Sequence, residues 1–84
     1  MRERIMHHLE IHQEYLDAII SGEKTWEMRE RRNRDFQVGD LLALRMNKLP
    51  YLGTIVEITY IMENRFGLKD GWVIMSIKPV EENE

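Results

Sequence analysis

The segment Gly22-Glu23-Lys24-Thr25-Trp26-Glu27-Met28-Arg29 decides how this chain is interpreted. It follows a short amphipathic helical pattern and alternates charged with large apolar residues, as a strand with two chemically different faces does. Trp26 and Met28 are expected to point to one face, and the polar residues between them to the other. A charged strand face beside a helix terminus is suited to form a binding cleft. The alternative is a solvated sheet surface.

Outward from this segment, periodicity and turn residues predict one strand, one helix and four further strands. Tyr15, Leu16, Ile19 and Ile20 recur at helical spacing, and Gly22 stands where a helix-terminating glycine is expected. The predicted elements are strands at 7–11, 24–30, 40–46, 54–61 and 72–77 and a helix at 12–21. This order predicts an α+β fold: a small, mostly antiparallel five-stranded sheet curled towards a barrel, with one early α-helix covering an opening.

The composition fits one globular domain over residues 1–84, with its core at about 7–79 and an acidic C-terminal tail at 80–84. The chain has no cysteine, which excludes disulfides, cysteine-based zinc sites and thiol nucleophiles. It has no apolar run long enough for a signal peptide or a membrane span. We therefore expect a cytoplasmic protein without a membrane partner.

Histidines and tryptophans are the first candidates for a site. His7, His8 and His12 fall across a predicted strand and a helix start, so they lack the spacing of a metal site. We expect surface or capping histidines and no metal. Trp26 and Trp72 are expected to pack in or near the core, and the alternative for each is stacking on a nucleic-acid base.

Basic residues are concentrated between positions 24 and 34, which hold five basic and two acidic residues although the whole chain has a net charge of −3. Arg29, Arg31, Arg32 and Arg34 offer fork-shaped donor sets that suit phosphate. The alternative is a solvated loop. A positive patch on an acidic protein favours an anionic ligand.

Lys24, Glu27 and Arg29 form the central candidate site. Glu27 and Arg29 share a strand face and lie about 7 Å apart by strand rise. If that face lines a cleft, Glu27 can accept hydrogen bonds from a base or amide, and Arg29 can hold Glu27 or an anion. In a dry cleft, Lys24 can act as a base.

The pattern Gly22-x-Lys24-x-x-Glu27-x-Arg29 resembles the G-x-K-x-x-E-x-R motif of ASCH domains, a branch of the PUA-like superfamily. The chain is similar to a family of short bacterial and phage ASCH-like proteins of uncharacterised function, from about Leu9 to Lys78. The similarity includes the preceding helix, Phe36-x-x-Gly39-Asp40, the strand ending Thr59-Tyr60-Ile61, and Gly67-Leu68-x-x-Gly71-Trp72-Val73-Ile74.

The resemblance implies a PUA-like β-barrel with a cleft between the early helix and the barrel, lined by Lys24, Glu27 and Arg29. Such domains are generally proposed to bind RNA. A similar bacterial ASCH protein hydrolyses acetylcytidine with a lysine, a threonine and a glutamate. Lys24 matches the lysine, but Glu27 stands at the threonine position, and the glutamate belongs to a downstream helical segment that this shorter chain lacks.

The leading hypothesis is therefore a module that binds RNA or a nucleotide, not an enzyme, and that needs no cofactor. Its ligand-binding residues are Lys24, Glu27, Arg29, Arg31, Arg32 and Arg34. One alternative is a small amidohydrolase acting on an acetylated nucleoside, with Lys24 as base and Glu27 as proton shuttle or orienting carboxylate. Another is a protein-interaction module that uses an exposed strand edge.

Overall fold

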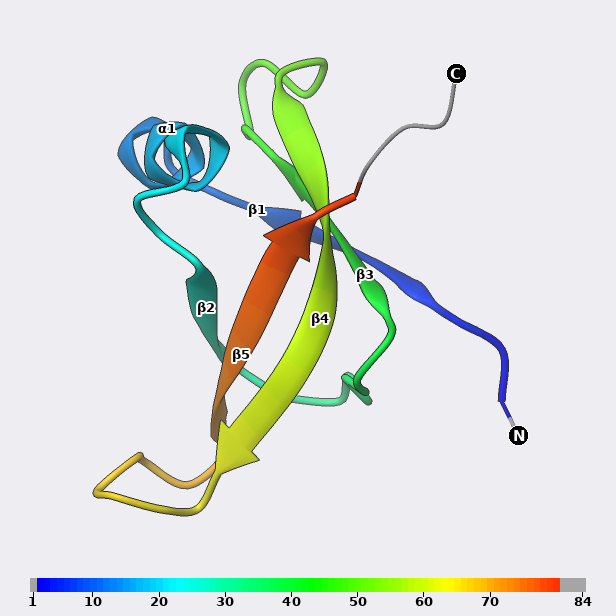
Figure 1. The fold of residues 1–84 in the computed structure, drawn as a ribbon, viewed down its shortest axis with the longest axis vertical. Coiled ribbons are helices and arrows are strands. Elements are labelled where there is room, and N and C mark those ends of the chain that lie inside the picture. The colour runs from blue at the N-terminus through cyan, green and yellow to red at the C-terminus, as the bar shows by residue number, and fades with distance from the viewer. Residues whose placement is uncertain (1, 81–84) are drawn as a thin grey trace.

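The computed structural model describes residues 2–80, and its elements follow the predicted order. They are β1 (Met6–Glu10), α1 (Gln13–Ser21), β2 (Trp26–Glu30), β3 (Leu41–Arg45), β4 (Gly53–Glu63) and β5 (Trp72–Pro79) (Figure 1). Each end lies within two residues of its predicted position, so the α+β class is confirmed. Apart from Val80, the acidic tail predicted at 80–84 lies outside the described residues.

One curled sheet contains all five strands in the order β1-β3-β4-β5-β2. Three neighbouring pairs are antiparallel, but β1 and β3 are parallel. The sheet is therefore mixed, and the prediction of a mostly antiparallel sheet is wrong. The physical reason is the long connection from β1 to β3, which passes through α1 and β2. A connection of this length allows a parallel pair, whereas a short hairpin forces an antiparallel one.

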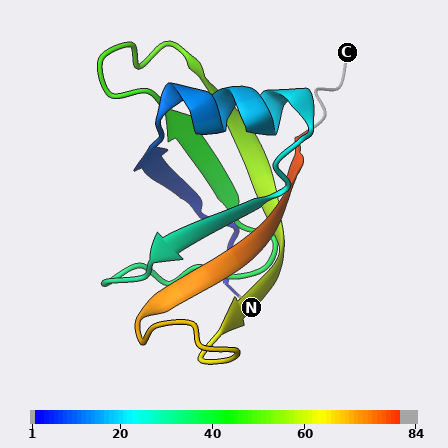
Figure 2. The same ribbon diagram turned by 90° about the vertical axis from the view of Figure 1, so that its left-hand side faces the viewer.

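The sheet curls because β4 is long and irregular. Ile58 pairs with Ile77 and Tyr60 with Ser76, so Thr59 is an extra residue in β4. Such a bulge bends its strand and increases the local twist. The hydroxyl of Thr59 donates a hydrogen bond to the main-chain oxygen of Ser76 at 3.2 Å. The result is a half-barrel in which β1 and β2 are the two edge strands (Figures 1 and 2).

Helix α1 connects the two edge strands and lies across one end of the sheet (Figure 2). It ends at the predicted glycine. Gly22 has a φ of 88°, a left-handed conformation that costs glycine little, and its N–H donates to the oxygen of Ile19. No helix within residues 2–80 is long and apolar enough to cross a membrane.

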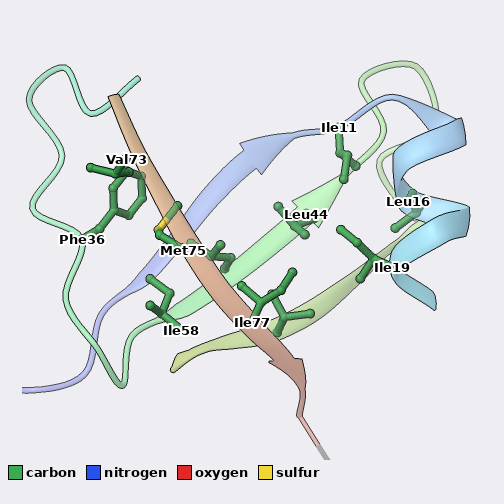
Figure 3. Close-up of a cluster of buried hydrophobic side chains, with 11 residues drawn as sticks. Ile11, Leu16, Ile19, Phe36, Leu44, Ile58, Val73, Met75 and Ile77 are labelled. Carbon is green, nitrogen blue, oxygen red and sulfur yellow. The ribbon is translucent and has the colours of Figure 1, made fainter. Parts of the chain in front are cut away.

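The core fills the concave face of the sheet, and α1 covers it at one end (Figure 3). Ile58 is fully buried, as expected if the apolar run at 55–61 shares the core. From the helix, Leu16 and Ile19 are buried, whereas Tyr15 and Ile20 are exposed at 45% and 62%. The buried stripe of α1 is thus narrower than the apolar stripe that the sequence predicts. The buried cluster comprises Ile11, Leu16, Ile19, Phe36, Leu42, Leu44, Val56, Ile58, Val73, Met75 and Ile77.

Candidate functional site

A cleft of about 810 Å³ is lined by the end of β1, the start of α1, the length of β2 and the loop that follows it. Ligand sites for small molecules commonly have volumes of about 300–1,000 Å³. The two edge strands contribute the largest share of the lining, and Tyr15 of α1, Trp72 of β5 and residues of the adjoining loops contribute the rest. This part of the fold is therefore large enough for one small ligand or one nucleotide unit.

The strand register explains why charged side chains of β2 point inwards. Glu27 lies opposite Met75 and Arg29 opposite Val73, both of which are core residues. Directly opposed residues share a sheet face, so Glu27 and Arg29 belong to the concave face, and Glu27 is only 3% exposed. The predicted alternation is right.

The predicted burial of the first tryptophan is wrong. Trp26 and Met28 lie on the other face of β2, and each is 45% exposed. The polar residues of this strand occupy the inner positions, and their charges are compensated by one another. Trp72 is half-buried, and both tryptophans line the cleft.

Lys24, Glu27 and Arg29 form one hydrogen-bonded unit, here called the charged triad. One carboxylate oxygen of Glu27 accepts a hydrogen bond from the Lys24 ammonium, and the other accepts one from Arg29 Nε at 2.7 Å. The side chains are 14%, 5% and 24% exposed in sequence order. Two cations around one carboxylate leave the triad with one net positive charge.

The turn after α1 places Lys24 in the cleft. The main-chain N–H of Lys24 donates to the oxygen of Ala18 at 3.0 Å, which ties this residue to the helix end. The ammonium lies 4.5 Å from the ring centroid of Trp26 and 5.8 Å from that of Tyr15. It also donates to the main-chain oxygen of Trp26 at 2.6 Å. Gly22, which makes this turn possible, thereby positions the first member of the motif.

Two arginines connect the edge strands across the cleft. Arg29 Nη2 donates to the main-chain oxygen of Glu10 at 2.8 Å, and Arg34 Nη2 donates to that of His8 at 3.1 Å. Both acceptors lie on β1, whereas the donors come from β2 and the following loop. Side chains, not a strand ladder, therefore bridge the two edges at these points.

The three arginines of the loop after β2 have different environments. Arg31 forms a two-point ion pair with Glu63, at 3.2 Å and 3.0 Å, and is not among the residues that line the cleft. Arg32 and Arg34 do line it. Arg32 has a φ of 52°, which is uncommon for a non-glycine residue, and its side chain is 77% exposed beside Glu30. The structure thus brings five of the six candidate residues to one cleft and places Arg31 elsewhere.

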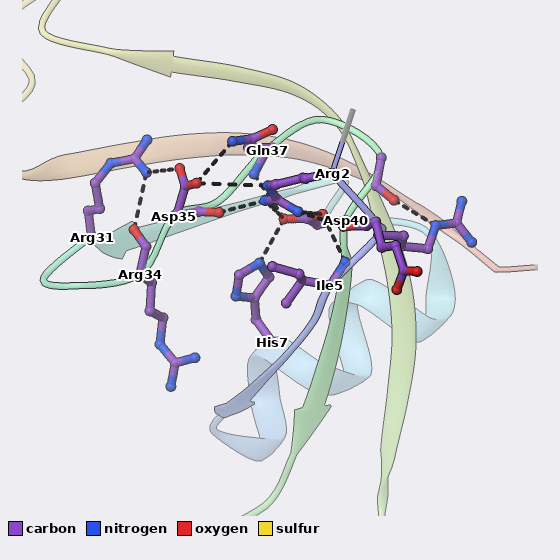
Figure 4. A network of polar contacts seen from close by, with 11 residues as sticks. Arg2, Ile5, His7, Arg31, Arg34, Asp35, Gln37 and Asp40 are labelled. Atoms are coloured by element: carbon purple, nitrogen blue, oxygen red, sulfur yellow. Dashed lines mark hydrogen bonds and ion pairs between the residues drawn. The ribbon is translucent and has the colours of Figure 1, made fainter.

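A second polar cluster, centred on Asp40, was not anticipated from the sequence (Figure 4). Asp40 is 2% exposed and accepts hydrogen bonds from both terminal nitrogens of Arg2, from His7 Nε2 and from the amides of Ile5 and Gln37. Burial raises the pKa of Asp40, but these hydrogen bonds outweigh it and hold the pKa well below its usual range. The cluster fastens the start of the chain to the turn before β3.

His7 accordingly differs from its prediction as a surface or capping residue. It is 6% exposed, and its ring lies 4.7 Å from that of Phe36. The signal that the sequence offers for this cluster is the turn pair Gly39-Asp40, and the burial of Asp40 is evident only from the structure. His8 and His12 are exposed. Within residues 2–80, no group of three or more histidine or carboxylate side chains is arranged to hold a metal ion.

The chemistry of the cleft follows from its hydrogen-bonding capacity. An ion-paired ammonium has three donors and no acceptor, and a guanidinium has five donors. Within the described contacts, Lys24 retains one N–H and Arg29 three, whereas both oxygens of Glu27 are engaged. The cleft therefore offers donors beside aromatic rings, which suits a ligand with acceptor atoms and a flat apolar face.

Comparisons with known proteins give a fold and a family. A search of the curated proteins finds no match. A solved structure titled "Crystal structure of hypothetical protein PH0355" is similar with a TM-score of 0.66 and 18% identity. The similarity covers 90% of this chain and 100% of that one, and at this identity it concerns the fold alone. Residues 6–77 match the family described as a domain of unknown function, DUF3850, and the chain belongs to that family.

Proposed function

We propose that this chain is a cytoplasmic PUA-like module of the ASCH type that binds RNA or a nucleotide in the cleft between β1 and β2. The charged triad is the observation that carries the proposal. Its donors are already held in place by Glu27, so a ligand does not have to order them. Preorganisation of this kind lowers the cost of binding.

The surroundings of the triad fit a nucleotide in two ways. Tyr15 and Trp26, each 45% exposed at the cleft, offer flat rings for base stacking, which contributes about 1–3 kcal/mol per base in proteins that bind single strands. Arg32 and Arg34 supply exposed guanidinium groups at the same cleft, and guanidinium groups suit phosphate oxygens. Arg31 is left out of this role because Glu63 holds it.

The same geometry favours binding over hydrolysis. A lysine that acts as a general base must be neutral, whereas Lys24 is paired with a buried carboxylate and donates to it. We therefore expect no release of acetate when purified protein is mixed with acetylcytidine. Sustained acetate release by the wild type that is lost in Lys24→Ala would refute the binding proposal and support the amidohydrolase alternative.

Equilibrium binding tests the proposal directly. Fluorescence anisotropy with a labelled single-stranded RNA, and competition by free nucleotides, should detect saturable binding by the wild type. Lys24→Ala should weaken it about tenfold or more, because it removes a donor and lets Glu27 lose one of its two partners. Arg65→Ala is the matched control, since Arg65 is an exposed cation that does not line the cleft.

The contrary results are equally specific. Equal weakening by Lys24→Ala and Arg65→Ala would mean that attraction is spread over the surface and that the cleft is not the site. Absence of binding to every RNA and nucleotide by a folded protein would refute the proposal and favour the protein-interaction alternative.

A further inference from the structure

The open edge of β2 faces the cleft. Within residues 2–80, β2 is an edge strand whose one neighbour in the sheet is β5. Ile77 N–H donates to Thr25 oxygen and Arg31 N–H donates to Gly71 oxygen, so the odd-numbered positions form the ladder with β5. In an antiparallel pair the intervening residues direct their main-chain groups away from the partner. The main-chain N–H and C=O groups of Trp26, Met28 and Glu30 therefore point to the open side.

Side-chain contacts show that this open side is the cleft. The oxygen of Trp26, the first residue of that row, accepts a hydrogen bond from the ammonium of Lys24. Met28, the next residue of the row, lines the same cleft. Within residues 2–80, neither the N–H nor the C=O of Met28 has a hydrogen-bonding partner. An open donor and an open acceptor thus stand side by side at the middle of the site.

The opposite wall is already engaged. Leu41 N–H donates to Ile5 oxygen and Ile11 N–H donates to Arg45 oxygen, so the odd-numbered residues of β1 pair with β3. His8 and Glu10 consequently face the cleft, and their oxygens accept from Arg34 and Arg29. The main-chain pair of Met28 is therefore better placed to receive a ligand than the oxygens of β1.

We propose that the main-chain N–H and C=O of Met28 read the Watson–Crick edge of a single unpaired base in this cleft. The inference rests on the proposed function and extends it to how a base is selected. A residue at such a position can exchange both an N–H···O and an O···H–N bond with one partner, as it does with a neighbouring strand. A nucleobase offers the same complement, since its Watson–Crick edge has a donor beside an acceptor.

If Met28 binds a base in this way, the cleft should select an unpaired base without strong preference among the four bases. Each base presents an adjacent donor and acceptor on that edge, so two main-chain groups distinguish them weakly. In a duplex the same edge is occupied by the complementary base, so a paired base cannot be bound. The chemistry is shared by a free nucleotide and by a base in single-stranded RNA, and the charge of Arg32 and Arg34 is compatible with both.

Proline substitution isolates the main-chain donor. Met28→Pro removes the N–H, and an edge strand tolerates it because this N–H takes no part in the ladder. Met28→Ala is the matched control, since it removes the same side chain and keeps the N–H. We expect Met28→Pro to weaken binding of uridine monophosphate about tenfold and Met28→Ala to weaken it less than about threefold. Equal affinities of the two variants would overturn the inference.

A ligand-side experiment keeps the inference testable if Met28→Pro does not fold. Wild-type protein is titrated with uridine monophosphate and with its N3-methylated form, in which a methyl group replaces the edge donor. Weaker binding of the methylated form, by about tenfold, is expected. Equal binding of both forms would overturn the inference.

Two further probes identify the source of the base and separate the two proposals. Single-stranded oligouridine should bind and its duplex with oligoadenosine should not, and equal binding of both would overturn the inference. Tighter binding of oligouridine than of the mononucleotide would mark RNA as the source, and equal binding would mark the free nucleotide. If neither Met28→Pro nor methylation of the base changes the binding affinity but Lys24→Ala lowers it, base recognition by Met28 is overturned while the proposed function stands.

Discussion

Glu27→Gln should destabilise the domain far more than its small change in shape suggests. Glutamine keeps one acceptor but turns N–H donors towards Lys24 or Arg29, which are themselves donors. Loss of one partner from a fully buried ion pair costs about 3–5 kcal/mol, and from an exposed pair about 0.2–1 kcal/mol. The Glu27 side chain is 5% exposed and its partners are 14% and 24% exposed, so we expect about 2–3 kcal/mol.

Urea unfolding measures this cost against a matched control on the same strand. A chain of this size is expected to be stable by roughly 4–13 kcal/mol, and at about 1 kcal/mol per molar urea the midpoint should fall by about 2–3 M. Glu30→Gln also removes a carboxylate paired with an arginine, but Glu30 and Arg32 are 46% and 77% exposed. It should shift the midpoint by less than about 1 M. Equal shifts for the two variants would refute the view that Glu27 anchors the triad.

Three other outcomes are expected. Ile58→Ala should cost about 2–5 kcal/mol, because Ile58 is fully buried; an unchanged melting temperature would contradict its core position. The folded pKa of Asp40 is lowered, so its contribution to stability is present above about pH 4 and is lost as the pH falls towards the folded pKa; acid unfolding should therefore be less pH-dependent in Asp40→Asn, and an identical pH profile would refute this. Neutralising Arg32 and Arg34 together should lower the log–log salt slope of RNA binding by about 1.4, whereas an unchanged slope would show that they touch no phosphate.

Local patterns predicted the helix and the strands well because the residues within each segment favour its secondary structure. β-branched residues at Ile55, Val56 and Ile58 favour a strand whatever lies beside it, and Gly22 marks the helix end by its left-handed backbone. The parallel pairing of β1 with β3 has no comparable local signal. It depends on where the chain returns after passing through α1 and β2.

The candidate site was predictable to the extent that it lies in one segment. Lys24, Glu27 and Arg29 meet because they belong to one turn and one strand. By contrast, Arg31 pairs with Glu63, which lies 32 residues away, and no spacing in the sequence indicates that contact. The outward position of Trp26 was missed for a related reason. Trp26 was assigned to the core because it is apolar, whereas the buried face of β2 carries Glu27 and Arg29, whose opposite charges compensate each other.

The most direct test of a base-binding cleft is a nuclear magnetic resonance titration of ¹⁵N-labelled protein with single-stranded oligouridine. Amide signals of residues 24–30 and the indole signal of Trp26 should shift together and saturate, with the amide of Met28 among the largest changes. The exposed loop residues Tyr51 and Phe66, at 75% and 89% exposure, should not move. Shifts confined to those loops, or none at saturating ligand, would contradict the account.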